Sequence, residues 1–275
     1  MNQTNELIGS INHYINEIKS IISINSRELN WIFNEKYKDP KRLLRHELQI
    51  NSQNGEDGVI NEIFLRIGTK NKVFAEIGIG DGLENNTAFL LSQDWRGYWI
   101  DANDEFTKNS QIKNFIDRGM LKTEILFVNR ENIKNSFEKL DIPKDLDLLC
   151  IDVDQNTYYI WEALIDYKPR VIVIEYNSAI PPNINWKVNY DPLKSWDGTQ
   201  NFGASLKAIE QLGALTGYCL VACDFNGVNA FLVREDLVAE KFSKPFTAEN
   251  HYEPPRYQFI HRRGHKRSIF DTPKN

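Results

Sequence analysis

The sequence has few cysteines, which argues against a fold built on disulfides. Three occur among 275 residues, at Cys150, Cys219 and Cys223, all within apolar stretches. An odd count without framework spacing is typical of small buried side chains in a reducing compartment. The chain also begins without a basic segment and a long apolar run, so we expect no signal peptide and a cytoplasmic protein.

An excess of positive charge and long apolar runs are also missing. Lys and Arg number 33 against 38 Asp and Glu, a net charge of -5, so we expect no nucleic-acid partner. No stretch is long and apolar enough to suggest a membrane span. The hydrophobic share of 41% and the length suit one sizeable globular core with extensions.

Residues 1–50 read as an N-terminal helical extension. Isoleucine and leucine recur there at alternating steps of three and four, with Asn25 at one position of the series. Ile at both core positions and a lone Asn are typical of a self-associating bundle, which predicts a homo-oligomer. Packing of this helix on its own domain is the alternative. The apolar positions are Ile8, Ile11, Ile15, Ile18, Ile22, Leu29 and Ile32.

Residues 51–240 alternate between short β-branched runs and amphipathic segments. This rhythm predicts a doubly wound α/β domain with a mostly parallel seven-stranded sheet. Asn226-Gly227 lies between the last two runs and predicts an antiparallel hairpin at the end of the sheet. We expect strands at 73–78, 97–101, 124–128, 146–152, 170–175, 217–224 and 228–234, and helices at 55–67, 85–93, 108–118, 132–140, 158–165 and 202–212.

Two segments interrupt or follow this rhythm. The aromatic loop at 178–200, with Phe202 beyond it, either stacks on a sugar or base or packs on itself. The tail at 241–275 contains the basic run His261-Arg-Arg-Gly-His-Lys-Arg267. This run either pairs with a diphosphate or is a solvated tail, and such runs are usually solvated. The aromatic residues are Trp186, Tyr190, Trp196 and Phe202.

The clearest chemical signal is Glu76-Ile-Gly-Ile-Gly-Asp-Gly82, between a predicted strand and a predicted helix. Gly78, Gly80 and Gly82 permit a tight turn and close approach of a ligand. We expect the following helix to offer free N–H groups at its start. Asp101 ends the next strand, where a carboxylate can accept hydrogen bonds from ribose hydroxyls.

The spacing within this turn favours one nucleoside cofactor. The third glycine comes one residue earlier than in a dinucleotide fingerprint, and Asp81 lies inside the turn. A carboxylate there repels a pyrophosphate and attracts the sulfonium and ammonium groups of S-adenosylmethionine. We therefore predict S-adenosylmethionine. An NAD(P)-dependent oxidoreductase and a non-catalytic, self-assembling nucleoside-binding module are the alternatives.

The same turn resembles the first motif of class I methyltransferases, and Asp101 matches their ribose-binding acid. More narrowly, residues 50–235 resemble FkbM-type O-methyltransferases, although Gln155 stands where that family often has glycine. The similar stretches are Ser52-Gln-Asn-Gly-Glu-Asp-Gly58, Ile151-Asp-Val-Asp-Gln-Asn156 and Val173-Ile-Glu-Tyr-Asn177. The resemblance implies transfer of a methyl group to a hydroxyl of a sugar or nucleotide-linked sugar, as in surface polysaccharide biosynthesis. It implies cofactor binding by Gln53, Asp57, Glu76, Gly78, Gly80, Asp81, Gly82, Asp101 and Asp152.

Polar side chains follow the fourth and fifth predicted strands. Asp152, Asp154, Glu175 and Asn177 should converge, because ligands bind at the carboxyl ends of such strands. Three carboxylates repel one another unless they are protonated or bind a cation. Their oxygens suit Mg²⁺ or Ca²⁺, so these four residues are candidate Mg²⁺ ligands. The metal-free alternative gives Asp152 to the amino group of the methyl donor and makes Asp154 the general base. The catalytic candidates are Asp152, Asp154 and Glu175.

Overall fold

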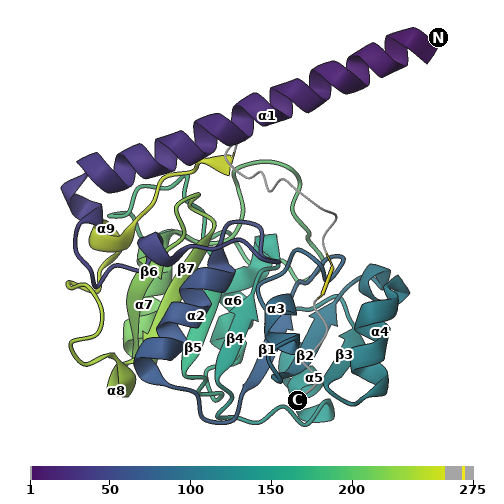
Figure 1. Cartoon of the computed structure of the whole chain (residues 1–275). Helices are drawn as coiled ribbons and strands as arrows, with labels where there is room; N and C mark the ends of the chain where they lie inside the picture. The colour runs from purple at the N-terminus through teal and green to yellow at the C-terminus, as the bar shows by residue number, and fades with distance from the viewer. Residues whose placement is uncertain (1, 258–267, 270–275) are drawn as a thin grey trace.

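The computed structural model describes residues 2–257 and 268–269, and a seven-stranded sheet forms its centre (Figure 1). The strand order is β3-β2-β1-β4-β5-β7-β6. Neighbours among β1 to β5 are parallel, whereas β7 is antiparallel to β5 and to β6. The predicted fold class is therefore confirmed, including the terminal hairpin. The strands are β1 Val73–Ile77, β2 Arg96–Asp101, β3 Leu121–Ile125, β4 Leu148–Ile151, β5 Val171–Glu175, β6 Tyr218–Cys223 and β7 Asn229–Arg234.

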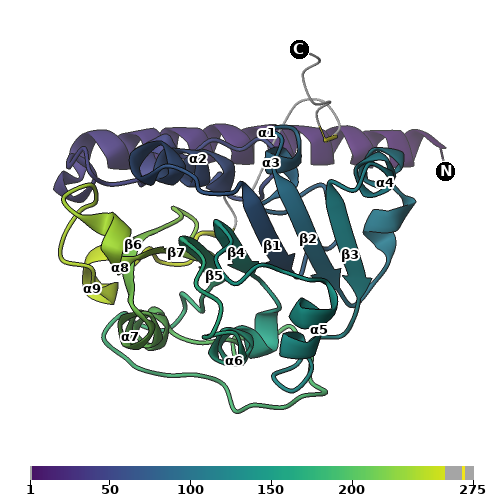
Figure 2. The ribbon, with the colours of Figure 1, turned by 90° about the horizontal axis from the view of Figure 1, so that it is seen from below.

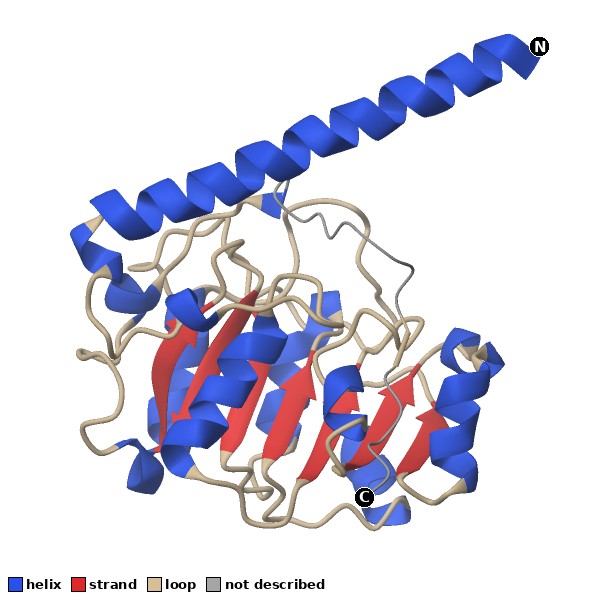
Figure 3. Ribbon diagram, viewed as in Figure 1, coloured by secondary structure: helices blue, strands red, loops and turns tan. Residues whose placement is uncertain are grey.

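Helices cover both faces of the sheet (Figures 2 and 3). One core cluster joins the sheet to α2, α3 and α4, and the other joins it to α5, α6 and α7. The central strands are buried on both faces because their apolar runs meet helices above and below. The helices are α1 Asn2–Phe33, α2 Glu56–Ile67, α3 Ala88–Leu91, α4 Ser110–Asp117, α5 Ile133–Lys139, α6 Thr157–Ala163, α7 Leu206–Thr216, α8 Glu235–Val238 and α9 Ala248–His251.

Three predicted elements are displaced, each by a local interaction. The third strand begins at Leu121, three residues before the predicted start, because it pairs from there with β2. The first crossover helix is reduced to α3, because residues 85–87 surround the Glu76 carboxylate. The helix predicted at 202–212 is α7, which begins after Ser205, whose side chain accepts a hydrogen bond from the Ala208 N–H at 3.2 Å.

The predicted N-terminal helix is α1, whose first half extends away from the body (Figure 1). Its apolar series does not pack on the domain: Ile15 is 44% exposed and Ile18 is 57% exposed. The helix does pack on its own domain, but through Ser20, Ser23 and Trp31 and not through this apolar series. No helix of the described chain is both long enough and apolar enough to cross a membrane. The three cysteines are free, as expected.

Candidate functional site

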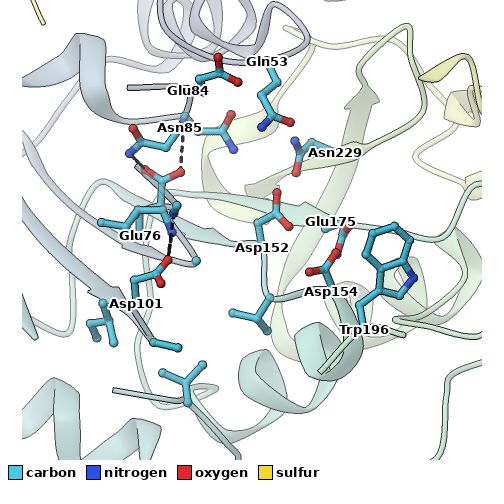
Figure 4. Close-up of a pocket in the computed structure, with 18 of the residues that line it drawn as sticks. Gln53, Glu76, Glu84, Asn85, Asp101, Asp152, Asp154, Glu175, Trp196 and Asn229 are labelled. Atoms are coloured by element: carbon cyan, nitrogen blue, oxygen red, sulfur yellow. Dashed lines mark hydrogen bonds between the residues drawn. The ribbon is translucent and has the colours of Figure 1, made fainter. Parts of the chain in front are cut away.

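The predicted site residues gather around a pocket of about 580 Å³ at the carboxyl ends of the parallel strands (Figure 4). The glycine turn after β1 and the end of β2 form one side. The loops after β4 and β5 form the other, and the start of β7 closes it. Of the residues predicted from the sequence, those that line the pocket are Gln53, Glu76, Gly78, Gly80, Asp81, Asp101, Asp152, Asp154 and Glu175.

The glycine turn is held by the end of β2. One carboxylate oxygen of Asp101 accepts hydrogen bonds from the backbone N–H groups of Ile79 and Gly80, at 2.7 and 2.9 Å. Gly80 has a φ of +59°, and no atom of the described chain lies within 4 Å of a Cβ placed there. The turn therefore leaves open space where a ligand can approach the backbone. Asp101 both shapes the turn and faces the pocket.

Glu76 organises the segment after the turn. Its buried carboxylate accepts hydrogen bonds from the Asn85 side chain at 2.6 Å and from the N–H groups of Asn86 and Thr87 at 2.9 and 3.0 Å. Burial raises the pKa of Glu76 to about 7, against the lowering effect of these donors. The Glu76 carboxylate thus takes the N–H groups of Asn86 and Thr87, directly ahead of α3, so these two are not free for a ligand.

Asp152, Asp154 and Glu175 converge from the ends of β4 and β5. Each offers an oxygen within 4.8 Å of those of the other two. Burial raises the pKa of Asp152 to about 8, and the charge of Asp154 adds to this effect. Burial, followed by the charge of Asp152, also raises the pKa of Glu175. At neutral pH this group of carboxylates therefore retains protons or takes up a cation.

Two further observations indicate that these three carboxylates form a binding site. Within the described residues, Glu175 Oε2 is buried and has no hydrogen-bond partner. Asp154 adopts a φ of +54°, a left-handed conformation that is uncommon for residues other than glycine. Strained backbone of this kind is concentrated at functional sites. The unpaired oxygen and the strained residue lie in one cluster, facing the pocket.

Three predicted residues lie outside the pocket lining. Asn177 is fully buried, and its amide donates to the carbonyls of Gln200 and Phe202 at 2.7 and 2.9 Å. It fixes the 200–202 loop, and its amide oxygen accepts a hydrogen bond from the Ala179 N–H at 3.1 Å. Asp57 accepts hydrogen bonds from the N–H groups at residues 50–52 and so shapes that loop. A Cβ on Gly82 would meet Ile112, Trp99 and Phe106, so this glycine serves packing.

Several lining residues were missed by the sequence analysis. Glu56 faces the pocket instead of its neighbour Asp57, and it accepts a 2.8 Å hydrogen bond from the Asn229 side chain. The sequence shows the acidic pair Glu56-Asp57, but only the orientation of α2 determines which of the two residues faces the pocket. Asn229 belongs to β7 and carried no sequence signal. Asn85, Asn156 and Asn229 also line the pocket, and each has a buried amide oxygen without a partner in the described chain.

Acidic side chains dominate the pocket lining. Among its described lining residues, Lys194 is the one lysine or arginine, and its ammonium lies 3.2 Å from Asp197. The unpaired amide oxygens are acceptors as well. A ligand that fits this surface brings hydrogen-bond donors and positive charge. The carboxylates are Glu56, Glu76, Asp81, Glu84, Asp101, Asp152, Asp154 and Glu175.

The aromatic loop contributes one side chain to the pocket. Trp196 lines it, 49% exposed, with its ring centroid 6.0 Å from that of Phe202. Tyr190 packs on Tyr159 at 5.0 Å and belongs to the outer surface. Trp186 borders a separate shallow hollow with Ile180 and Ile184. The loop thus packs largely on the surrounding domain, through contacts such as Tyr190 with Tyr159 and Trp186 with Ser205. The basic run 261–267 lies outside the described residues.

Comparison with known proteins finds distant structural likeness. No family model matches the chain, and no curated protein matches it. The chain is similar to a spermidine synthase from Thermotoga maritima, at 14% identity and a TM-score of 0.39 over 72% of this chain and 71% of that one.

An O-methyltransferase family protein from Burkholderia thailandensis shows 10% identity and a TM-score of 0.38 over 78% and 71% of the two chains. The methyltransferase CalO6 shows 14% identity and a TM-score of 0.33 over 58% and 56%. Likeness at this level says nothing about the activity of this chain. The FkbM resemblance stays a prediction.

Proposed function

We propose that this chain is an S-adenosylmethionine-dependent methyltransferase that acts on a hydroxyl group of a saccharide. The observation that carries the proposal is the meeting, in one pocket, of an open glycine turn, the Asp101 carboxylate and the cluster of Asp152, Asp154 and Glu175. The glycine turn leaves room for a nucleoside next to the protein backbone, and Asp101 can accept hydrogen bonds from its ribose. The cluster comes from the opposite side of the pocket, and we propose that the acceptor binds beside it.

The charge of the pocket favours S-adenosylmethionine over NAD(P). A pyrophosphate needs free N–H groups or cations, and helix N-termini normally supply them. Here Glu76 takes the N–H groups of Asn86 and Thr87, and α3 has only four residues. Asp81 adds a carboxylate at the turn. A sulfonium and an ammonium group are attracted where a pyrophosphate is repelled.

The same argument narrows the acceptor to one without phosphate groups. The diphosphate of a nucleotide-linked sugar would approach eight lining carboxylates, with Lys194 already paired to Asp197. A sugar hydroxyl donates a hydrogen bond, and the unpaired oxygens of Glu175, Asn156 and Asn229 are acceptors. Trp196 offers an apolar face on which a sugar ring can stack. We therefore favour a saccharide without a nucleotide.

In the proposed reaction the acceptor oxygen attacks the methyl carbon as the bond from carbon to sulfur breaks. The hydroxyl proton passes to Asp154, and S-adenosylhomocysteine leaves. Holding the two substrates in line can supply about 7–11 kcal/mol of the barrier. A general base contributes roughly 10²–10⁴-fold. Positioning by the pocket is therefore the larger effect, and the raised pKa of Asp154 suits a base that takes a proton.

The three carboxylates also fit Mg²⁺ by ligand type, since this cation takes oxygen ligands. Asp152, Asp154 and Glu175 would hold it, without Asn177. Bound there, Mg²⁺ would lower the pKa of an acceptor hydroxyl, as metals do for water. Dialysis against a chelator tests this proposal. Lost turnover that Mg²⁺ restores would support a metal, and unchanged turnover would leave Asp154 as a base without one.

Ligand-induced stabilisation tests the cofactor. We expect S-adenosylmethionine and S-adenosylhomocysteine to raise the melting temperature and NAD to leave it unchanged, because a ligand that binds only the native state stabilises it. Asp101→Ala should abolish the shift, and Asp104→Ala, an exposed acid nearby, should retain it. A shift with NAD alone would favour an oxidoreductase. Donor binding without S-adenosylhomocysteine release across a panel of saccharides would favour a non-catalytic module.

A further inference from the structure

Helix α1 docks on the body of the molecule through its polar face. Ser20 and Ser23 are buried, and Arg27 lies 3.4 Å from the buried Glu47 carboxylate. Trp31 packs against the small cluster of Tyr37, Leu44 and Phe225. In a seven-residue repeat a to g that takes Ile8 as position a, these four α1 residues fall at b, c and f. The docked face is therefore opposite the apolar series.

The face that points away from the body is apolar over most of the length of α1. We call its a and d positions the seam: Ile8, Ile11, Ile15, Ile18, Ile22, Asn25, Leu29 and Ile32. Every apolar seam residue is at least 44% exposed. An amphipathic helix on a single globular domain turns its apolar side inward. This helix does the reverse, so its seam forms a large exposed apolar surface of the kind that marks an interaction site.

We propose that the seam is covered by the seams of further copies of this chain, in a parallel bundle of more than two helices. Isoleucine at both a and d favours three or four strands over two. Leu7, Tyr14 and Ile21 occupy g positions and are each at least 58% exposed, so the apolar stripe is wider than a two-stranded seam. The domain lies at b, c and f, on the outside of such a bundle.

Asn25 selects the parallel, in-register arrangement. It occupies a d position and is exposed in the single chain. In a parallel bundle each Asn25 meets its counterparts, and amide groups hydrogen-bond to one another. In an antiparallel pair centred on the seam, Asn25 would face the layer of Ile15 and lose these partners. A lone core Asn is known to fix register at a cost in stability.

The charges on α1 favour copies of the chain over a membrane surface. Helices that lie on membranes are rich in Lys and Arg on their polar face. Between residues 2 and 33 the sequence has one lysine, Lys19, and one arginine, Arg27. Arg27 is paired with Glu47 on the body. Adsorption to vesicles is therefore the competing result that the experiment must distinguish.

Sedimentation equilibrium of the full chain tests the proposal. We expect a mass of three or four chains at micromolar concentration. I15K/I22K, which places charges at two a positions, should yield the monomer. I24K is the matched control: Ile24 is 55% exposed but lies at position c, so the assembly should persist. A melting shift with S-adenosylhomocysteine or an unchanged circular dichroism spectrum of the domain would show that I15K/I22K still folds.

A cysteine scan tests the orientation. Ile11→Cys at a d position should oxidise to linked chains, because parallel copies bring the same position together, whereas Ile24→Cys should not. The proposal fails if the unmodified chain is monomeric, or if I24K dissociates it as fully as I15K/I22K. Linkage by Ile24→Cys but not Ile11→Cys would also overturn it. So would a monomer that binds anionic phosphatidylserine vesicles through Ile15 and Ile22.

Discussion

The backbone of Gly78 lies directly against the carbonyl group of Asp152. A Cβ on Gly78 would be 1.7 Å from that oxygen, and the residue has a φ of +82°. Gly78 also donates its N–H to the Ile100 carbonyl at 2.9 Å. One position thus joins the ends of β1, β2 and β4, bringing the cofactor side of the pocket next to the acidic cluster. The contact leaves no room for a side chain.

Gly78→Ala should therefore destabilise the protein far more than Gly80→Ala. At Gly80 alanine incurs only the left-handed backbone penalty of about 1–2 kcal/mol, because no described atom is near its Cβ. At Gly78 the same penalty adds to an overlap with backbone, for a total of at least about 3 kcal/mol. Urea denaturation of both variants measures the difference. Equal losses would show that the 1.7 Å approach does not govern this site.

Asp154→Asn should slow methyl transfer by roughly 10²–10⁴-fold and leave S-adenosylhomocysteine affinity intact, because it removes a base that acts on the acceptor. Asp152→Asn should weaken donor binding as well, since Asp152 is the member of the cluster that lies next to the glycine turn (Figure 4). Isothermal titration and single-turnover rates separate the two effects. Parallel loss of affinity and rate in Asp154→Asn would refute the assignment of Asp154 as base.

Stability of the ligand-free protein should fall as pH rises from about 4 to 8. Burial raises the pKa of Asp152 to about 8 and that of Glu76 to about 7. In that window the folded state binds more protons than the unfolded state, whose carboxyl groups titrate near 4. The free energy of unfolding therefore decreases with pH, by at least about 1 kcal/mol overall.

Urea denaturation at pH 5.5 and pH 8.5 checks this direction. Asp152→Asn should show a shallower decrease, because it removes one of the groups responsible. Asp117→Asn, an exposed acid at the end of α4, is the control and should retain the full decrease. A protein that becomes more stable between these two pH values would contradict the raised pKa of both groups.

The fold was predictable because its signals are local. The β-branched runs and Asn226-Gly227 specify the strands and the final hairpin within a few residues each. The start of α7 was missed, since Phe202 fits the apolar pattern as well as Leu206 does. Only the capping contact of Ser205 decides between them. Similarly, the helix predicted at 85–93 is shorter in the structure, because residues 85–87 bond to the Glu76 carboxylate instead. The burial of that carboxylate depends on the whole sheet.

The sequence predicts those site residues that lie at the carboxyl ends of strands. Asp101 and Glu175 end their strands and Asp152 directly follows one, so their convergence follows from a parallel sheet. Asn177 comes two residues after the end of β5, yet its side chain turns to the 200–202 loop. No pattern in the sequence encodes that choice. Glu56 and Asn229 come from other parts of the chain, and only tertiary packing brings them to the pocket.

Glu76→Gln should destabilise the protein by about 1–3 kcal/mol, although the side chain keeps its size. Glu76 is buried and accepts hydrogen bonds from Asn85, Asn86 and Thr87. An amide has one acceptor oxygen, so at least one of these donors would face an NH₂ group and remain unpaired, which costs about that amount. The loss of this hydrogen bond should also shift residues 85–87 and so weaken S-adenosylhomocysteine binding, because residues 85 and 86 line the pocket.

Glu84→Gln provides the matched control for this change. It is an exposed acid in the same loop and also lines the pocket, whereas the N–H groups of Asn86 and Thr87 bond to Glu76. We expect Glu84→Gln to lower the unfolding free energy by less than Glu76→Gln does, because Glu84 is exposed and Glu76 is buried. If both variants unfold alike, charge and not hydrogen bonding would explain the role of Glu76. If only Glu76→Gln lowers the unfolding free energy, the Glu76 carboxylate holds the cofactor side of the pocket in shape through its hydrogen bonds.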